Sequence, residues 1–100
     1  MLKGWTAGII DGEGCVRIED NRGVIKVYNT DYRIVETLKK EWGGSLYEST
    51  RSDRPRSKRI WTWALTGKAA LKFLIIIEPF LISRGERARE VISLYSNRVL

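Results

Sequence analysis

The feature that most constrains this chain is a four-residue spacing of glycine, at Gly4, Gly8 and Gly12. Residues four apart lie on one face of an α-helix, so the run from Leu2 to Asp11 predicts a helix with one face that lacks side chains. Each glycine inside a helix costs about 1 kcal/mol relative to alanine. Such a helix needs a strong packing reason, and the most direct one is the close approach of a second helix backbone.

Two acids, Asp11 and Glu13, stand at the end of this predicted helix among Gly12 and Gly14. Glycine permits positive-φ or tight-turn conformations, so we expect the Glu13 carboxylate to be held out on a turn. A helix C-terminus carries partial negative charge, which disfavours acids there unless a cation lies nearby. The segment is therefore either an ordinary acidic turn or a metal-binding one, and its spacing alone leaves both open.

Hydrophobic periodicity and turn residues predict the remaining elements. Asp31 is expected to cap a helix that stops at Gly43 and Gly44, and Pro79 is expected to break a later one. The predicted order is helix, hairpin (15–20 and 24–28, with a turn at 21–23), helix, hairpin (45–50 and 59–65), then helices over 68–77 and 86–97. This is an α+β fold with four antiparallel strands and helices on one face of the sheet.

The first hairpin alternates apolar and polar residues, so its two faces can be separated. The expected core face carries Val16, Ile18, Ile25 and Val27, and the opposite face carries Arg17, Glu19, Lys26 and Tyr28. A slip of one residue would exchange the faces. For the same reason, Trp61 and Trp63 are predicted either on the open face or in the core.

Composition limits the function classes. The 100 residues suit one domain, and 18 basic against 12 acidic residues give a net charge of +6, as expected for a partner with a phosphate backbone. The absence of histidine excludes His-based catalysis and His-metal clusters, and the single Cys15 excludes an internal disulfide. No membrane-spanning segment, signal peptide or transit peptide is visible, so we expect an intracellular protein, in the cytoplasm, nucleoid or organelle matrix.

Residues 6–14, Thr-Ala-Gly-Ile-Ile-Asp-Gly-Glu-Gly, resemble the LAGLIDADG motif of homing endonucleases. Only Thr6, for leucine, departs from the consensus, and a glutamate at position 13 is a frequent family variant. The resemblance continues through 61–74 and 78–88, which look like the family's last strand, third helix, Pro-aromatic-Leu break and basic loop. It therefore spans nearly the whole chain, and it implies the family's saddle-like, four-stranded fold.

A single copy of the motif implies a homodimer, with the first helices of two subunits packed across a two-fold axis. The predicted interface residues are Gly4, Ala7, Gly8, Asp11 and Gly12. This arrangement would bring the two Glu13 carboxylates together, and a divalent cation would relieve their repulsion. Oxygen ligands favour Mg²⁺, for which Mn²⁺ can substitute, and the predicted metal-site residues are Glu13, Gly12 and Asp11, the last mainly in support.

The resemblance also assigns candidate catalytic roles beyond Glu13. Arg84 stands where many members carry a lysine near the scissile phosphate, and Asn29 and Arg33 match positions that order solvent around the phosphates. Arginine would neutralise charge but could not act as a base, and an exposed loop arginine without function is the alternative.

The implied partner is double-stranded DNA with near-palindromic halves, with intron RNA as a further partner. A basic segment within 51–59 is either a phosphate-gripping tip or a solvated loop. The predicted DNA-binding residues are Arg17, Glu19, Lys26, Tyr28, Tyr47, Ser49, Arg51, Arg54, Arg56, Lys58, Arg59, Trp61 and Trp63.

The leading function is therefore a metal-dependent, site-specific double-strand DNA endonuclease carried by a mobile intron or intein. The alternative is a catalytically weak or inactive relative that acts as a splicing maturase or a DNA-binding regulator. A purely structural protein would require the basic sheet face to be incidental.

Overall fold

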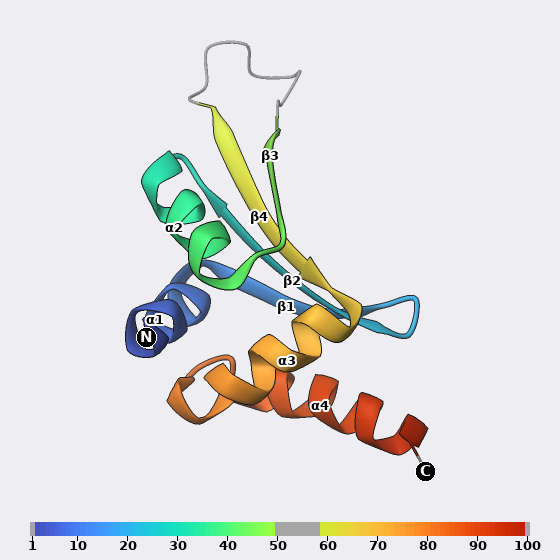
Figure 1. Cartoon of the computed structure of the whole chain (residues 1–100). Coiled ribbons are helices and arrows are strands. Elements are labelled where there is room, and N and C mark those ends of the chain that lie inside the picture. The colour runs from blue at the N-terminus through green and yellow to red at the C-terminus, as the bar shows by residue number, and fades with distance from the viewer. Residues whose placement is uncertain (1, 50–58, 100) are drawn as a thin grey trace.

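The computed structural model describes residues 2–49 and 59–99 as one sheet with helices against one side (Figure 1). The elements are α1 (Lys3–Glu13), β1 (Gly14–Glu19), β2 (Arg22–Asn29), α2 (Tyr32–Trp42), β3 (Ser45–Ser49), β4 (Ile60–Thr66), α3 (Gly67–Ile77), a 3₁₀ turn η1 (Glu78–Phe80) and α4 (Gly85–Val99). The predicted α+β order is confirmed.

The four strands form one antiparallel sheet in the order β1-β2-β4-β3. The second strand of each hairpin therefore lies at the centre, and β1 and β3 form the edges. The helices gather on one side of the sheet, and no helix of the described ranges lies on the other side (Figure 1). α4 packs against α3 and β1. The uncovered side is called the open face below.

The core lies between the sheet and the helices. Ile25, Val27 and Trp63 from the sheet are fully buried, as are Leu38 from α2 and Leu74 from α3. Removing these large apolar side chains from water contributes roughly 1.5–3 kcal/mol each, which fixes the helices to this face.

The predicted helix signals are confirmed. The Asp31 carboxylate accepts a hydrogen bond from the Arg33 backbone N–H at 3.0 Å and caps α2. Gly43 and Gly44 have φ values of 76° and 93°, a left-handed backbone that favours glycine and ends α2. Pro79 lies in η1, directly after the end of α3.

The first turn and the surroundings of Gly23 differ from the prediction. Asp20 and Asn21 have φ values of 50° and 61°, so they form the turn, and Gly23 lies inside β2. A Cβ at Gly23 would lie 2.6 Å from Val91 of α4, and the Gly23 N–H donates to the Tyr95 hydroxyl at 3.0 Å. Glycine is present here because α4 approaches the strand closely.

Two further predictions for this region are corrected, one on a side chain and one on the backbone. Ile18 was expected in the core but is 38% exposed, because it lies near the end of edge strand β1. Neither Gly12 nor Gly14 uses a positive φ, because α1 continues through Glu13 and Gly14 is already extended. Glycine at position 14 is required by space instead, since a Cβ there would lie 2.8 Å from the Ile10 backbone.

Candidate functional site

The glycine face of α1 is exposed. A Cβ at Gly4, Gly8 or Gly12 would meet nothing within 4 Å, so the chain itself places no atoms over this face. The opposite face, with Thr6, Ala7 and Ile10, is buried in the core. The prediction that Ala7 contacts a partner subunit is therefore wrong, because its side chain is only 1% exposed.

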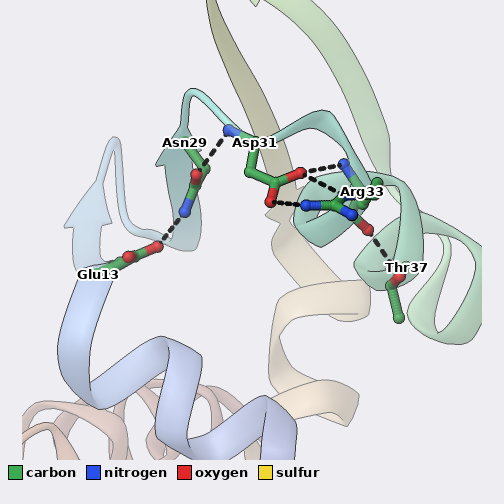
Figure 2. A network of polar contacts seen from close by, with 5 residues as sticks. All are labelled: Glu13, Asn29, Asp31, Arg33 and Thr37. Carbon is green, nitrogen blue, oxygen red and sulfur yellow. Dashed lines mark hydrogen bonds and ion pairs between the residues drawn. The ribbon is translucent and has the colours of Figure 1, made fainter.

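Glu13 is the last residue of α1 and its side chain is exposed. Its carboxylate accepts a hydrogen bond from the Asn29 side-chain amide at the end of β2 (Figure 2). Because α1 runs directly into β1, which pairs with β2, the fold brings residues 13 and 29 together. The bond holds the Glu13 carboxylate at the end of the sheet and leaves it exposed.

A polar network extends from Glu13 toward α2 (Figure 2). The Asn29 side-chain oxygen accepts from the Asp31 N–H at 2.8 Å. The Asp31 carboxylate accepts from Arg33 Nε at 3.1 Å and Nη2 at 2.9 Å, and this guanidinium lowers the pKa of Asp31. Arg33 thus joins the network through Asp31 and does not contact Glu13, and its backbone carbonyl accepts from the Thr37 hydroxyl at 2.7 Å. The sequence predicts Asp31 only as a helix cap and not as the link between Asn29 and Arg33. The spacing of two residues on each side of Asp31 is the signal that could have indicated this link.

Asp11 has a different environment from Glu13. Its carboxylate accepts from the backbone N–H groups of Ile82 at 2.8 Å and Arg84 at 2.9 Å, and from the Ser83 hydroxyl at 3.1 Å. Partial burial raises the pKa of Asp11, but the hydrogen bonds from Arg84, Ile82 and Ser83 together outweigh it, so the pKa is lowered. Both Asp11 oxygens therefore bind the segment before α4, which favours a positioning role over a metal-ligand or interface role.

Asp11 brings Arg84 to the end of α1. The Arg84 backbone is held by Asp11, and Arg84 Nε donates to the Gly14 carbonyl at 3.3 Å. Gly14 directly follows Glu13, so a cation and an exposed carboxylate stand at the same end of one helix. No ion pair of the described residues includes Arg84.

The donor set for a metal is incomplete in one chain. Among the described residues, no group of three or more Cys, Asp or Glu side chains is placed to hold a metal ion. The Glu13 carboxylate and the neighbouring Gly12 carbonyl are hard oxygen donors, which suit Mg²⁺ or Mn²⁺. Two such donors fill only part of the coordination shell of Mg²⁺, so the remaining oxygen ligands must come from elsewhere.

The open face carries several of the predicted DNA-binding residues. Strand alternation and register place Arg17, Glu19, Lys26, Tyr28 and Tyr47 on it. Tyr28 and Tyr47 are 44% and 46% exposed and both pair with buried Thr62 on central strand β4. The face therefore has an aromatic centre with charged residues toward β1.

The structure corrects the placement of the tryptophans. Trp63 is fully buried and donates from Nε1 to the Gly43 carbonyl at 2.7 Å, so the prediction that it contacts DNA is wrong. Trp61 lies on the same helix-covered side and contacts the Tyr32 ring edge-on at 4.8 Å. Arg59, the residue before β4, forms an ion pair with Glu48 at 3.3 Å. Arg51, Arg54, Arg56 and Lys58, and the side chain of Ser49, lie outside the described part of the structure.

The arrangement of these elements is the fold of the LAGLIDADG homing endonucleases, which confirms the resemblance seen in the sequence at the level of the fold. One similar structure is the homing endonuclease I-CvuI in complex with its target in the presence of calcium. It is 21% identical at a TM-score of 0.70, and the match covers 90% of this chain and 62% of that one.

Two further structures share the fold. The archaeal intron-encoded homing endonuclease I-Vdi141I, complexed with DNA, is 15% identical at a TM-score of 0.69, covering 97% of this chain and 68% of its own. I-SmaMI, as the K262A mutant, is 22% identical at a TM-score of 0.61, covering 98% and 39%.

The present sequence thus spans less than two thirds of the length of I-CvuI. No family model and no curated protein matches the amino-acid sequence. Within the described ranges, no helix is long and apolar enough to cross a membrane.

Proposed function

We propose that this chain is a divalent-metal-dependent endonuclease that cuts double-stranded DNA at a specific, near-palindromic target, as a homodimer. The observation that carries the proposal is the exposed Glu13 carboxylate at the end of a helix whose glycine face is uncovered. Similar folds in complex with DNA, in I-CvuI and I-Vdi141I, support DNA as the substrate.

The proposed dimer pairs α1 with α1 of a second copy through Gly4, Gly8 and Gly12. Their missing side chains allow two helix backbones to approach closely, and nothing within the chain occupies that space. Two-fold pairing would bring one Glu13 from each subunit to a shared axis. The incomplete donor set of one chain supports this arrangement, because two copies would supply twice the oxygen ligands.

The chain's own residues then divide the chemistry. Glu13 and the Gly12 carbonyl would hold Mg²⁺, or Mn²⁺, which when bound supplies Lewis-acid stabilisation of phosphoryl charge and acidifies water. Asn29 orients the Glu13 carboxylate through its side-chain amide. Arg84 neutralises charge at the phosphate as a cation fixed beside Gly14, and a guanidinium does not serve as a general base. Arg33, whose guanidinium is bound by Asp31, is proposed to interact with solvent or phosphate at the edge of the site.

Target recognition is assigned to the open face. Exposed charged and aromatic side chains on two-stranded ribbons fit the major groove of B-DNA. Glu19, Lys26, Tyr28 and Tyr47 are the proposed reading residues, and Arg17 at the β1 edge is a further proposed DNA contact. Residues 1–100 are proposed to form one domain.

A cleavage screen tests the proposal. The native chain and Glu13→Gln are incubated with a randomised duplex library and Mg²⁺, and cut ends are sequenced, while binding is measured separately. The amide keeps the size of the side chain but removes its charge, so we expect cleavage to fall by roughly 100-fold or more with binding retained. Glu36→Gln, an equal charge change on α2, is the control that keeps activity.

The screen can also contradict the proposal. If the native chain binds DNA tightly but leaves no cut ends in Mg²⁺ or Mn²⁺, the protein is a binding module, either a maturase or a DNA-binding regulator. Retained cutting by Glu13→Gln would remove Glu13 from the mechanism.

A further inference from the structure

A cleft of about 520 Å³ lies between edge strand β1 and the segment that begins α4. The β1 wall includes Gly14, Cys15 and Arg17, and the opposite wall carries Arg84 and Arg87 together with Glu86 and Glu90. Three arginines from two distant parts of the sequence thus line one hollow. Arg87 has no role in the proposed cleavage site or on the open face.

Each arginine is anchored within the chain. Arg84 Nε donates to the Gly14 carbonyl at 3.3 Å, and Arg17 Nε donates to Cys15 Sγ at 2.8 Å. Arg87 Nη1 pairs with Glu90 at 2.9 Å, with both side chains about half exposed. A guanidinium has five N–H donors, so these contacts leave donors for a ligand. Exposed ion pairs contribute little to stability, so Arg87 can exchange Glu90 for a stronger anion at small cost.

The charges of the cleft favour a singly charged anion. Three arginines face two glutamates, and Glu90 is already paired with Arg87. The first turn of the 15-residue helix α4 adds partial positive charge at this end. A phosphodiester carries one negative charge, which is shared by two non-bridging oxygens, and a guanidinium can donate a hydrogen bond to each of them.

The position of the cleft links it to DNA rather than to a small anion. Its wall includes Gly14, which directly follows Glu13, and Arg84, which Asp11 holds beside the same helix end. A duplex engaged at Glu13 would therefore lie close to the cleft.

We propose that this cleft binds a backbone phosphate of the DNA, held by Arg17, Arg84 and Arg87, with Arg87 as a DNA contact outside the open face. The inference rests on the proposed function, because DNA must be the ligand of the whole molecule. The contact is independent of base sequence, so it fixes the position of the duplex and carries no specificity.

DNA binding by a matched pair of variants tests the role of Arg87. Arg87→Ala and Lys40→Ala each remove one cation from a glutamate-paired position on a helix, but Lys40 pairs with Glu36 on α2, away from the cleft. The ligand is a duplex whose sequence the library screen identifies as a target, and binding is measured in Ca²⁺. We expect Arg87→Ala to weaken binding about tenfold and to reduce the slope of the logarithm of the binding constant against the logarithm of the salt concentration by about 0.9 per protomer. Lys40→Ala should change binding less than about twofold. Equal effects of the two variants would overturn the proposal.

A charge change of the opposite sign gives a second test. Glu86→Gln removes a repulsive carboxylate from the cleft, so we expect tighter binding of the same duplex, whereas Glu36→Gln on α2 should leave it unchanged. If Glu86→Gln leaves affinity unchanged, the anion does not sit in the cleft.

Phosphate binding without DNA separates this inference from the proposed function. Inorganic phosphate titrated into the ¹⁵N-labelled native protein should shift the arginine Nε–Hε resonances of residues 17, 84 and 87, with weaker effects in Arg87→Ala. If no duplex binds but phosphate moves these resonances, the endonuclease proposal fails and DNA is not the ligand of the cleft, although the three arginines bind an anion. If duplex binds but neither probe perturbs them, the cleft proposal fails alone.

Discussion

At the scale of single residues, the two acids at the end of α1 have separate tasks despite being two positions apart. Asp11 binds the backbone before α4 and has a lowered pKa, whereas Glu13 is exposed and contacts Asn29. The proposed function therefore assigns the metal to Glu13. In the same proposal Asp11 is a positioning residue, which acts on the site through Arg84.

Replacement of Asp11 should reveal this positioning role as a pH-dependent loss of stability. The folded-state pKa of Asp11 lies below its ordinary value of about 3.9. The contribution of the Asp11 carboxylate to the free energy of unfolding is therefore complete above about pH 5 and is lost as the pH falls through the folded-state pKa. We expect Asp11→Asn to lose about 1 kcal/mol of unfolding free energy at pH 7, because its amide cannot accept all three hydrogen bonds. Urea unfolding at pH 7 and pH 3 measures the difference, which should shrink at pH 3. A difference that is independent of pH would contradict the assigned ionic role.

At the scale of elements, α1 has one face that belongs to the core and one that the chain leaves uncovered. Thr6, Ala7 and Ile10 are buried, whereas Gly4, Gly8 and Gly12 have open space where a Cβ would lie. Glycine is costly in a helix, so the exposed stripe is best explained by a second backbone.

The variant Gly8→Leu should keep the fold of the monomer but prevent dimerisation. The Cβ of Gly8→Leu would meet no atom of the chain within 4 Å, and the exchange improves helix propensity by up to about 1 kcal/mol, so the monomer should keep or raise its Tm. It should block the approach of two α1 helices and give a monomer by light scattering, with cleavage lost. Gly14→Ala is the contrasting variant, because its Cβ would lie 2.8 Å from the Ile10 backbone and should lower stability without acting on the seam. A dimer that persists in Gly8→Leu would contradict the seam.

The sequence predicts the elements better than their long-range contacts. Periodicity, the Asp31 cap and the Gly43-Gly44 stop depend on neighbours a few residues away, and each is confirmed. The face of Trp63 could not be decided, because a period of two fixes alternation but not which side is covered. The hydrogen bonds from residues 82–84 to Asp11 span more than 70 positions in the sequence, and no local sequence pattern predicts them.

At the scale of the whole molecule, the proposed function assigns half of a cleavage site to each chain. Helices close one side of the sheet, the other side offers Arg17, Lys26, Tyr28 and Tyr47, and Glu13 stands at the end of the helix with the uncovered face. Within the described residues no chain-internal cluster completes a metal site. The central claim is that two copies supply their Glu13 carboxylates to one cleavage centre.

Cleavage by mixed dimers tests this claim most directly. Native chain and Glu13→Gln are unfolded together at varied ratios, refolded at constant total concentration, and assayed with Mg²⁺ on the duplex found in the library screen. If both carboxylates act in one centre, a mixed dimer cuts neither strand, and the initial rate of strand cleavage, nicks included, falls as the square of the native fraction. A rate that falls in direct proportion to the native fraction would show that each subunit cuts without its partner's Glu13, and would contradict the shared site.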